Sequence, residues 1–151
     1  MNECIKEVFT LILDINDAPV AIGEKDKEYY DALKAEELFN NTEWKDIFII
    51  ALGTGFRNRL RREIGKQHSG GLFRRSYLKE EDETLIAAVA LSIESPDVLL
   101  DGEKIIHIAE EYAHCGIGIL DKKRDNSYGA FEKEFEQEVL QLCEEIFGRD
   151  L

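Results

Sequence analysis

The chain of 151 residues has few prolines, few cysteines and no long hydrophobic run. Its two prolines, Pro19 and Pro96, lie in no proline-rich or low-complexity linker, so we expect a single domain over residues 1–151. Three cysteines without close spacing are typical of reduced thiols rather than of a disulfide framework. A bilayer-spanning helix needs about 18 consecutive apolar residues, and this chain has no such run. The N-terminus also lacks the pattern of a secretory signal. The sequence therefore predicts a cytoplasmic protein that is not inserted in a membrane.

Motifs for nucleotide chemistry and nucleophilic catalysis are missing as well. The pair Gly53-x-Gly55 lacks the third glycine and the strand-to-helix context of a dinucleotide site. The sequence contains neither a Walker motif nor a nucleophile elbow. Asp97, Asp101 and Lys104 resemble the acidic-acidic-lysine set of metal-dependent nucleases, but that chemistry needs residues that converge from separate strands. Here they crowd into one short stretch with helix-start signals, so we interpret the match as a coincidence.

Histidine, cysteine and glutamate residues form only fragments of metal-binding patterns. Glu111-x-x-His114 has the spacing that di-iron helical bundles use, but a second such pair is needed, and neither His68 nor His107 has a glutamate three positions before it. His107, His114 and Cys115 could share one helix, yet three ligands on one helix rarely close a tetrahedral site. We therefore expect no metal and no cofactor, and we expect His114 to be an ordinary residue of a helix interface. A metal-dependent enzyme is the least favoured alternative.

The charge is strongly acidic overall but is unevenly distributed. The net charge is −13, whereas residues 57–75 carry seven cations and a single acid, Glu63. That segment therefore has a charge of +6 and the rest of the chain −19. Its cations are Arg57, Arg59, Arg61, Arg62, Lys66, Arg74 and Arg75. Such a segment could neutralise phosphates of a nucleic acid, pair with acidic helices of the same chain or of a second copy, or be disordered.

Apolar residues recur at helical spacing along most of the chain. Residues 2–14 and 26–37 are predicted as helices, although residues 9–15 could also form a strand. Helices are further predicted over 44–52, 81–92, 103–120 and 128–147, with one short turn through 96–100. The sequence thus predicts an all-α, compact, single-domain bundle of about six helices with a long basic loop over residues 57–77.

Local signals add detail to this bundle. Thr42 is the expected N-cap of the helix over 44–52, which is apolar nearly all round and is expected at the centre of the bundle. Gly53 and Gly55 are expected to loosen or end that helix, while Asp101 is expected to cap the helix over 103–120. In the last helix one face is expected to point inward; it contains Phe131, Phe135, Val139, Leu142 and Ile146.

Three stretches together resemble a known family. They are Lys25-Asp-Lys-Glu-Tyr-Tyr with Leu33, Trp44-Lys-Asp-Ile-Phe-Ile-Ile-Ala-Leu-Gly-Thr-Gly-Phe-Arg-Asn, and Ala109-Glu-Glu-Tyr-Ala-His-Cys-Gly-Ile-Gly-Ile-Leu. They are similar to the fourth family of small Dnd system-associated proteins, whose genes accompany the bacterial and archaeal machinery for DNA phosphorothioation. Where that family has Asn-Gly and a glutamate in the last stretch, this chain has His114-Cys115 and Gly118. The resemblance covers residues 22–120, and it implies no catalytic residues.

The resemblance implies a non-enzymatic accessory protein of a DNA phosphorothioation-linked modification and defence system. On this interpretation the seven cations of residues 57–75 are the candidate contacts to nucleic acid or to an acidic protein partner. The alternative is a helical protein–protein interaction or self-association module without a nucleic-acid role, in which the basic loop docks on acidic helices of another subunit.

Overall fold

The computed structural model describes residues 17–148, in which five α-helices and two short 3-10 helices form. In chain order these are α2 (Asp26–Lys34), α3 (Trp44–Arg57), η1 (Arg75–Tyr77), α4 (Glu80–Ile93), η2 (Pro96–Leu100), α5 (Gly102–Asn126) and α6 (Phe131–Phe147). No β-strand forms within this range, so the all-α prediction is confirmed there. The helix predicted over residues 2–14 lies outside the described residues.

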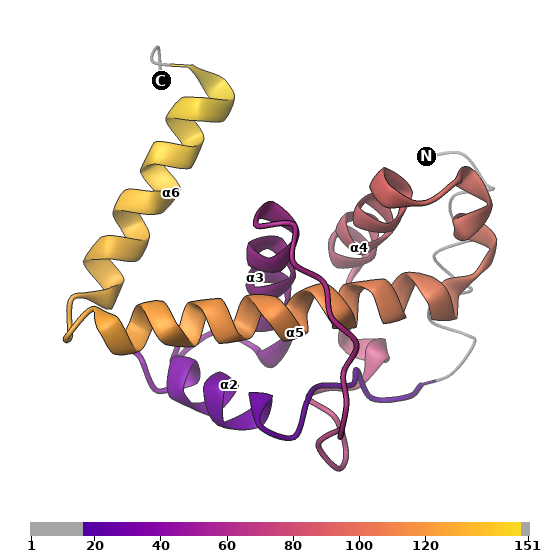
Figure 1. Cartoon of the computed structure of the whole chain (residues 1–151), viewed down its shortest axis with the longest axis horizontal. Helices are drawn as coiled ribbons and strands as arrows, with labels where there is room; N and C mark the ends of the chain where they lie inside the picture. The colour runs from indigo at the N-terminus through magenta and orange to yellow at the C-terminus, as the bar shows by residue number, and fades with distance from the viewer. Residues whose placement is uncertain (1–16, 149–151) are drawn as a thin grey trace.

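Helix α5 is the element against which the others pack. Figure 1 shows it running across the molecule, with α3 crossing it near its middle and α2 alongside, while α4 lies nearer its N-terminal half. Ile105, Ala109 and Ile117 of α5 are completely buried. The sequence placed the 44–52 helix at the centre, but α2, α3 and α4 all contact α5 instead. No helix among residues 17–148 is long and apolar enough to cross a membrane.

Helix α3 begins and ends differently from the prediction. The Asp46 carboxylate accepts a hydrogen bond from the Glu43 backbone N–H at 3.0 Å, so Glu43 is the N-cap. The Thr42 hydroxyl instead donates to the carbonyl of Phe39 at 2.7 Å. Gly53 and Gly55 do not end the helix, which continues to Arg57.

The continuation through Gly55 has a packing reason. A Cβ atom on Gly55 would lie 2.0 Å from the Tyr112 carbonyl oxygen, and a Cβ on Gly116 would lie 1.7 Å from that of Ala51. The backbones of α3 and α5 therefore touch where the helices cross, and only glycine fits at these two positions.

Backbone hydrogen bonds hold the C-terminal half of the basic segment, residues 66–75, against residues 18–24. Residues 66–75 run antiparallel to residues 18–24: Val20 N–H donates to Phe73 O at 2.7 Å, Leu72 N–H to Val20 O at 2.9 Å, and His68 N–H to Ile22 O at 2.9 Å. Phe73 itself is buried against Phe48 of α3. The loop expected over 57–77 is thus shorter than predicted, because Arg57 belongs to α3 and Arg75–Tyr77 to η1.

The connection around Pro96 and Asp101 agrees with the sequence signals. Pro96 begins η2, and the Asp101 carboxylate accepts a hydrogen bond from the Lys104 backbone N–H at 3.1 Å, which caps α5. Asp97 is exposed in η2, and Lys104 lies 3.5 Å from Glu94. The nuclease-like set therefore does not converge.

Helix α6 departs most from the predicted bundle. It turns away from α5 at a short corner, where Tyr128 has φ +53° and Gly129 has φ +90°, and it projects from the rest of the molecule (Figure 1). Of the five side chains expected to point inward, Phe131 is buried, and Phe135, which packs against Phe39, and Leu142 are partly buried. Val139 is 42% exposed and Ile146 is 69% exposed. The prediction that this whole face packs in the core is therefore wrong.

Candidate functional site

The seven predicted cations differ in their surroundings: six are exposed and Arg75 is buried. The chain leaves the end of α3, crosses α5 and descends toward the start of α2 (Figure 1). Along this path Arg61 lies 4.0 Å from the Glu111 carboxylate and over the ring of Tyr112. Farther on, Lys66 lies 3.2 Å from Glu24. These two cations therefore face acids of their own chain.

Arg74 and Arg75 are neighbours with opposite environments. Arg74 is exposed and lies 3.2 Å from Asp17. Arg75 is buried and makes two hydrogen bonds to the Glu103 carboxylate, at 2.5 and 3.1 Å. This bidentate pair lowers the pKa of Glu103, chiefly through the hydrogen bond from Arg75. Arg75 ties η1 to α5 and is not on the surface, so the prediction that it contacts a ligand does not fit the structure.

The free energy of unfolding can test the different roles of Arg74 and Arg75. We expect Arg75→Ala to lower the free energy of unfolding by about 2 kcal/mol, because it removes a buried side chain with charge-assisted hydrogen bonds. Arg74→Ala removes an exposed pair and should change stability by less than about 1 kcal/mol. Urea denaturation followed by circular dichroism measures both. Equal effects of the two substitutions would contradict this assignment.

Arg57, Arg59 and Arg62 remain as the exposed, unpaired cations of the segment. Within residues 17–148 no carboxylate lies within 4 Å of their charged groups. Residues 57–62 carry four arginines and no acid. We call these three side chains the basic cluster.

The backbone holds the basic cluster in a defined turn. Leu60 N–H donates to Gly55 O at 3.0 Å and Arg59 N–H to Phe56 O at 3.0 Å, the hydrogen-bond pattern of a Schellman motif that ends α3. Arg59 takes the left-handed position, with φ +55°, where glycine is usual. An arginine therefore occupies a conformation that costs about 1 kcal/mol.

The two histidines of α5 have different surroundings: His114 contacts α2, whereas His107 pairs with acids of its own helix. His114 Nδ1 lies 2.5 Å from the buried Asp26 carboxylate, which also accepts a hydrogen bond from the Gly23 N–H. His107 lies on another side, 3.7 Å from Glu111. Within the described part of the chain no group of three His, Cys, Asp or Glu side chains is arranged to hold a metal ion. His114 is the helix-interface residue that the sequence predicted.

Two further buried carboxyl groups, Glu110 on α5 and Glu83 on α4, were not singled out by the sequence. Burial raises the pKa of Glu110, although its carboxylate accepts a hydrogen bond from the Ala21 N–H. Glu83, in the acidic first turn of α4, is only 2% exposed, and its Oε1 has no hydrogen-bond partner. Burial, reinforced by the nearby charges of Glu80 and Asp82, raises the pKa of Glu83 to about 7.

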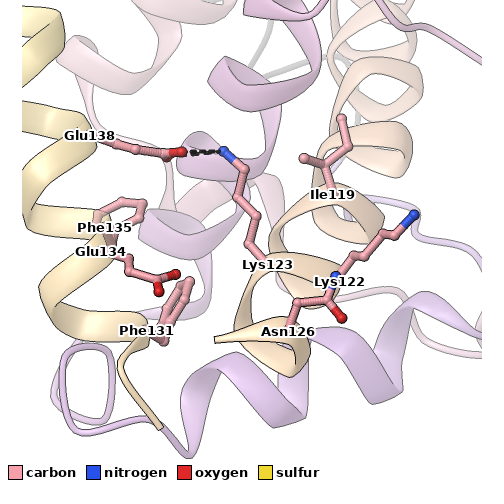
Figure 2. Close-up of a pocket in the computed structure, with 8 residues that line it drawn as sticks. All are labelled: Ile119, Lys122, Lys123, Asn126, Phe131, Glu134, Phe135 and Glu138. Carbon is pink, nitrogen blue, oxygen red and sulfur yellow. Dashed lines mark hydrogen bonds and ion pairs between the residues drawn. The ribbon is translucent and has the colours of Figure 1, made fainter. Parts of the chain in front are cut away.

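A groove follows the corner between α5 and α6. In Figure 2, Phe131 and Phe135 of α6 face Ile119 of α5 across a cavity of about 360 Å³. Lys123 donates to both oxygens of Glu138, at 2.8 and 3.0 Å, and bridges the two helices. A neighbouring hollow continues the groove to α3, where Arg57 forms part of its lining. The periodicity of the sequence predicts an apolar face on α6. It does not show that this face lines an open groove.

The two surfaces differ in the groups that they expose. The basic cluster offers guanidinium groups to phosphates or carboxylates, and the groove offers apolar side chains beside Lys122 and Lys123. Comparison of the chain with protein-family models, with curated proteins and with solved structures finds no match to any of them.

Proposed function

We propose that this chain is a non-enzymatic accessory protein of a DNA phosphorothioation-linked modification and defence system, and that its basic cluster contacts nucleic acid. One observation carries the contact: Arg57, Arg59 and Arg62 are exposed, and no carboxylate of the described residues lies within 4 Å of them. The genomic context rests on the resemblance of residues 22–120 to Dnd system-associated proteins. On this proposal, genes beside this one encode phosphorothioation or restriction components.

Arginine suits the proposed contact physically. Its guanidinium group donates two parallel hydrogen bonds to a phosphate, and it stays charged at any physiological pH. The −19 charge on the rest of the chain repels a nucleic acid elsewhere and so restricts contact to the basic cluster. Lys66 and Arg74 are exposed as well but lie beside Glu24 and Asp17, which compete with phosphate for them.

DNA binding tests the proposal directly. We expect fluorescence anisotropy to detect duplex DNA binding at low salt, with an affinity that falls as salt rises. Replacing Arg59 and Arg62 by alanine should lower the slope of log K against log salt by about 2, since each phosphate contact contributes about 0.9.

A matched double variant, Lys66→Ala with Arg74→Ala, removes the same charge from the paired part of the segment. It should keep most of the affinity, whereas Arg59→Ala with Arg62→Ala should lose it. Wild-type protein that fails to bind at low salt would contradict the nucleic-acid contact. Equal losses from the two double variants would show that net charge, and not the basic cluster, drives binding.

A second candidate function, a protein–protein interaction or self-association module, is favoured by a separate observation. The outer part of α6 exposes Leu140, Ile146 and Phe147 at 65–69%. Neighbouring apolar side chains exposed to this extent are typical of interaction sites.

A further inference from the structure

A second cavity lies at the other end of α3 from the basic cluster. Its volume is about 520 Å³, within the range of about 300–1,000 Å³ that is usual for small-molecule sites. Its walls come from α2, the start of α3, η1 and the residue that precedes α4. We call it the Trp44 pocket, after the first residue of α3. The 14 residues of α3 rise 1.5 Å each, so this pocket and Arg57 lie about 20 Å apart.

Two aromatic side chains, Tyr77 and Trp44, line the Trp44 pocket together with the buried Phe73. Tyr77 of η1 is 61% exposed, whereas Trp44 is partly buried against the core. An exposed aromatic ring beside a cavity offers its face to a planar group, because stacking covers both faces and removes them from water. Tyr77 is therefore the ring on which a planar ligand would stack, and Trp44 forms part of the wall.

The charged side chains that line the pocket carry a positive excess. Three lysines line it against one acid, Glu43. Lys45 is buried, and its charge is balanced by the Asp82 carboxylate, to which it donates at 2.8 Å. Lys34 and Lys79 have no carboxylate within 4 Å among residues 17–148. After Lys45 is set aside, two free cations remain against one carboxylate, and the pocket favours an anionic ligand.

We infer that the Trp44 pocket binds a nucleoside phosphate, either a free nucleotide or one nucleotide of a nucleic-acid strand. The base stacks on Tyr77, and Lys34 and Lys79 neutralise the phosphate. Lys34 Nζ lies 5.4 Å from the centre of the Trp44 ring, so cation and aromatic ring occur together in one cavity. The exposed Glu43 carboxylate accepts hydrogen bonds from N–H groups of a base, which a simple aromatic acid lacks.

The fluorescence of Trp44 tests the inference, because Trp44 is the single tryptophan of the chain and lines the pocket. We expect adenosine monophosphate to change its intensity or emission wavelength in a saturable way, and inorganic phosphate to have no such effect. Saturation by adenosine monophosphate identifies a free nucleotide as the source of the ligand. Saturation by a single strand of oligodeoxyadenylate alone identifies a nucleic-acid strand. No saturable change with either probe, or an equal change with inorganic phosphate, overturns the inference.

Substitutions in the pocket should weaken the binding of whichever of these two probes saturates. Tyr77→Ala removes the stacking ring and should raise the dissociation constant at least about fivefold, whereas Tyr77→Phe keeps the ring and should retain the affinity. Lys34→Ala with Lys79→Ala removes both free cations and should raise the dissociation constant about tenfold. Circular dichroism and the thermal midpoint check that each variant is folded.

Matched controls remove the same groups elsewhere. Lys122→Ala with Lys133→Ala takes two exposed lysines from α5 and α6, and Tyr128→Ala takes a tyrosine that is 95% exposed at the corner before α6. All three side chains lie outside the Trp44 pocket, so these variants should bind the probe as the wild type does. Equal losses from the control and pocket variants overturn the inference, because binding would then follow net charge or any exposed ring.

The Trp44 pocket goes beyond the proposed function and fails separately from it. Arg59→Ala with Arg62→Ala should leave the change in Trp44 fluorescence intact, since both arginines lie at the far end of α3. Tyr77→Ala should leave the salt dependence of duplex DNA binding intact, because paired bases are not free to enter a pocket. A protein that binds duplex DNA without a nucleotide response at Trp44 removes the pocket alone, and the reverse result removes the basic cluster alone.

Discussion

Gly116→Ala is expected to destabilise the protein by at least about 3 kcal/mol, although it adds only one methyl group. The added Cβ would lie 1.7 Å from the Ala51 carbonyl oxygen and 2.8 Å from the Gly55 nitrogen, and both are backbone atoms inside helix α3. Neither can move without separating α3 from α5. Thermal unfolding by circular dichroism should show a midpoint lower by about 10 °C, since each kcal/mol shifts the midpoint by about 2–4 °C at this chain length.

Gly118→Ala is the control for that substitution. Gly118 lies on the same helix, but no atom is within 4 Å of the position its Cβ would take. Alanine favours a helix over glycine by about 1 kcal/mol, so this variant should be slightly more stable than the wild type. The same contrast is expected on α3, where Gly55→Ala meets the Tyr112 carbonyl and Gly53→Ala meets nothing. Similar effects of Gly116→Ala and Gly118→Ala would mean that the helix crossing is looser than described.

Glu83→Gln is expected to stabilise the protein at neutral and alkaline pH by up to about 3 kcal/mol. Burial raises the pKa of Glu83 from 4.5 to about 7, so the folded state holds a proton that the unfolded chain has already released. Stability from this group is complete below pH 4.5, is lost as the pH rises toward 7, and stays low above it. Each unit of pKa difference corresponds to about 1.4 kcal/mol.

The measurement is a series of urea denaturations from pH 4.5 to 8. Wild-type and Glu83→Gln curves should nearly coincide at the acidic end and separate progressively up to about pH 7. Glu81→Gln changes the same charge in the same first turn of α4, but at an exposed position, and should leave the pH profile within about 0.5 kcal/mol of wild type. A constant offset between wild type and Glu83→Gln at every pH would contradict a buried proton at this site.

Features that depend on neighbouring residues could be predicted from the sequence. Pro96 at the start of η2 and Asp101 as the cap of α5 were predicted, because both act on backbone groups within three residues. The N-cap of α3 was assigned one residue early, to Thr42. The signal for Glu43, the Asp46 carboxylate three residues later that accepts from the Glu43 N–H, has the same local character.

Features that depend on distant residues could not be predicted. Arg75 reads as one more cation of a basic loop, and nothing near it in the chain shows that Glu103 meets it or that η1 buries it. Glu83 stands in the sequence among four consecutive acids, residues 80–83, and nothing near it in the chain shows that its carboxyl group alone is buried. Gly55 looked like a helix end because its partner, the Tyr112 carbonyl, is remote in sequence.

The groove beside α6 shows what the spacing of apolar residues cannot predict. The apolar spacing of Phe131, Phe135 and Val139 indicates that a helix has a face to cover, but it does not say which surface covers it. The prediction of a closed bundle assigned that role to the same chain, whereas the structure leaves Val139 and Ile146 of that face exposed.

Because α6 projects from the corner at Tyr128 and Gly129, a small change in the backbone dihedrals of that corner would displace the far end of the helix. The contacts of α6 with the rest of the chain lie mainly in its first half, and its 17 residues extend about 25 Å from that corner. A rotation of about 10° in the corner dihedrals would carry the tip of the helix through about 4 Å, nearly one helical turn. The position of the Phe147 end therefore depends on the corner dihedrals together with the Phe39–Phe135 contact and the Lys123–Glu138 pair.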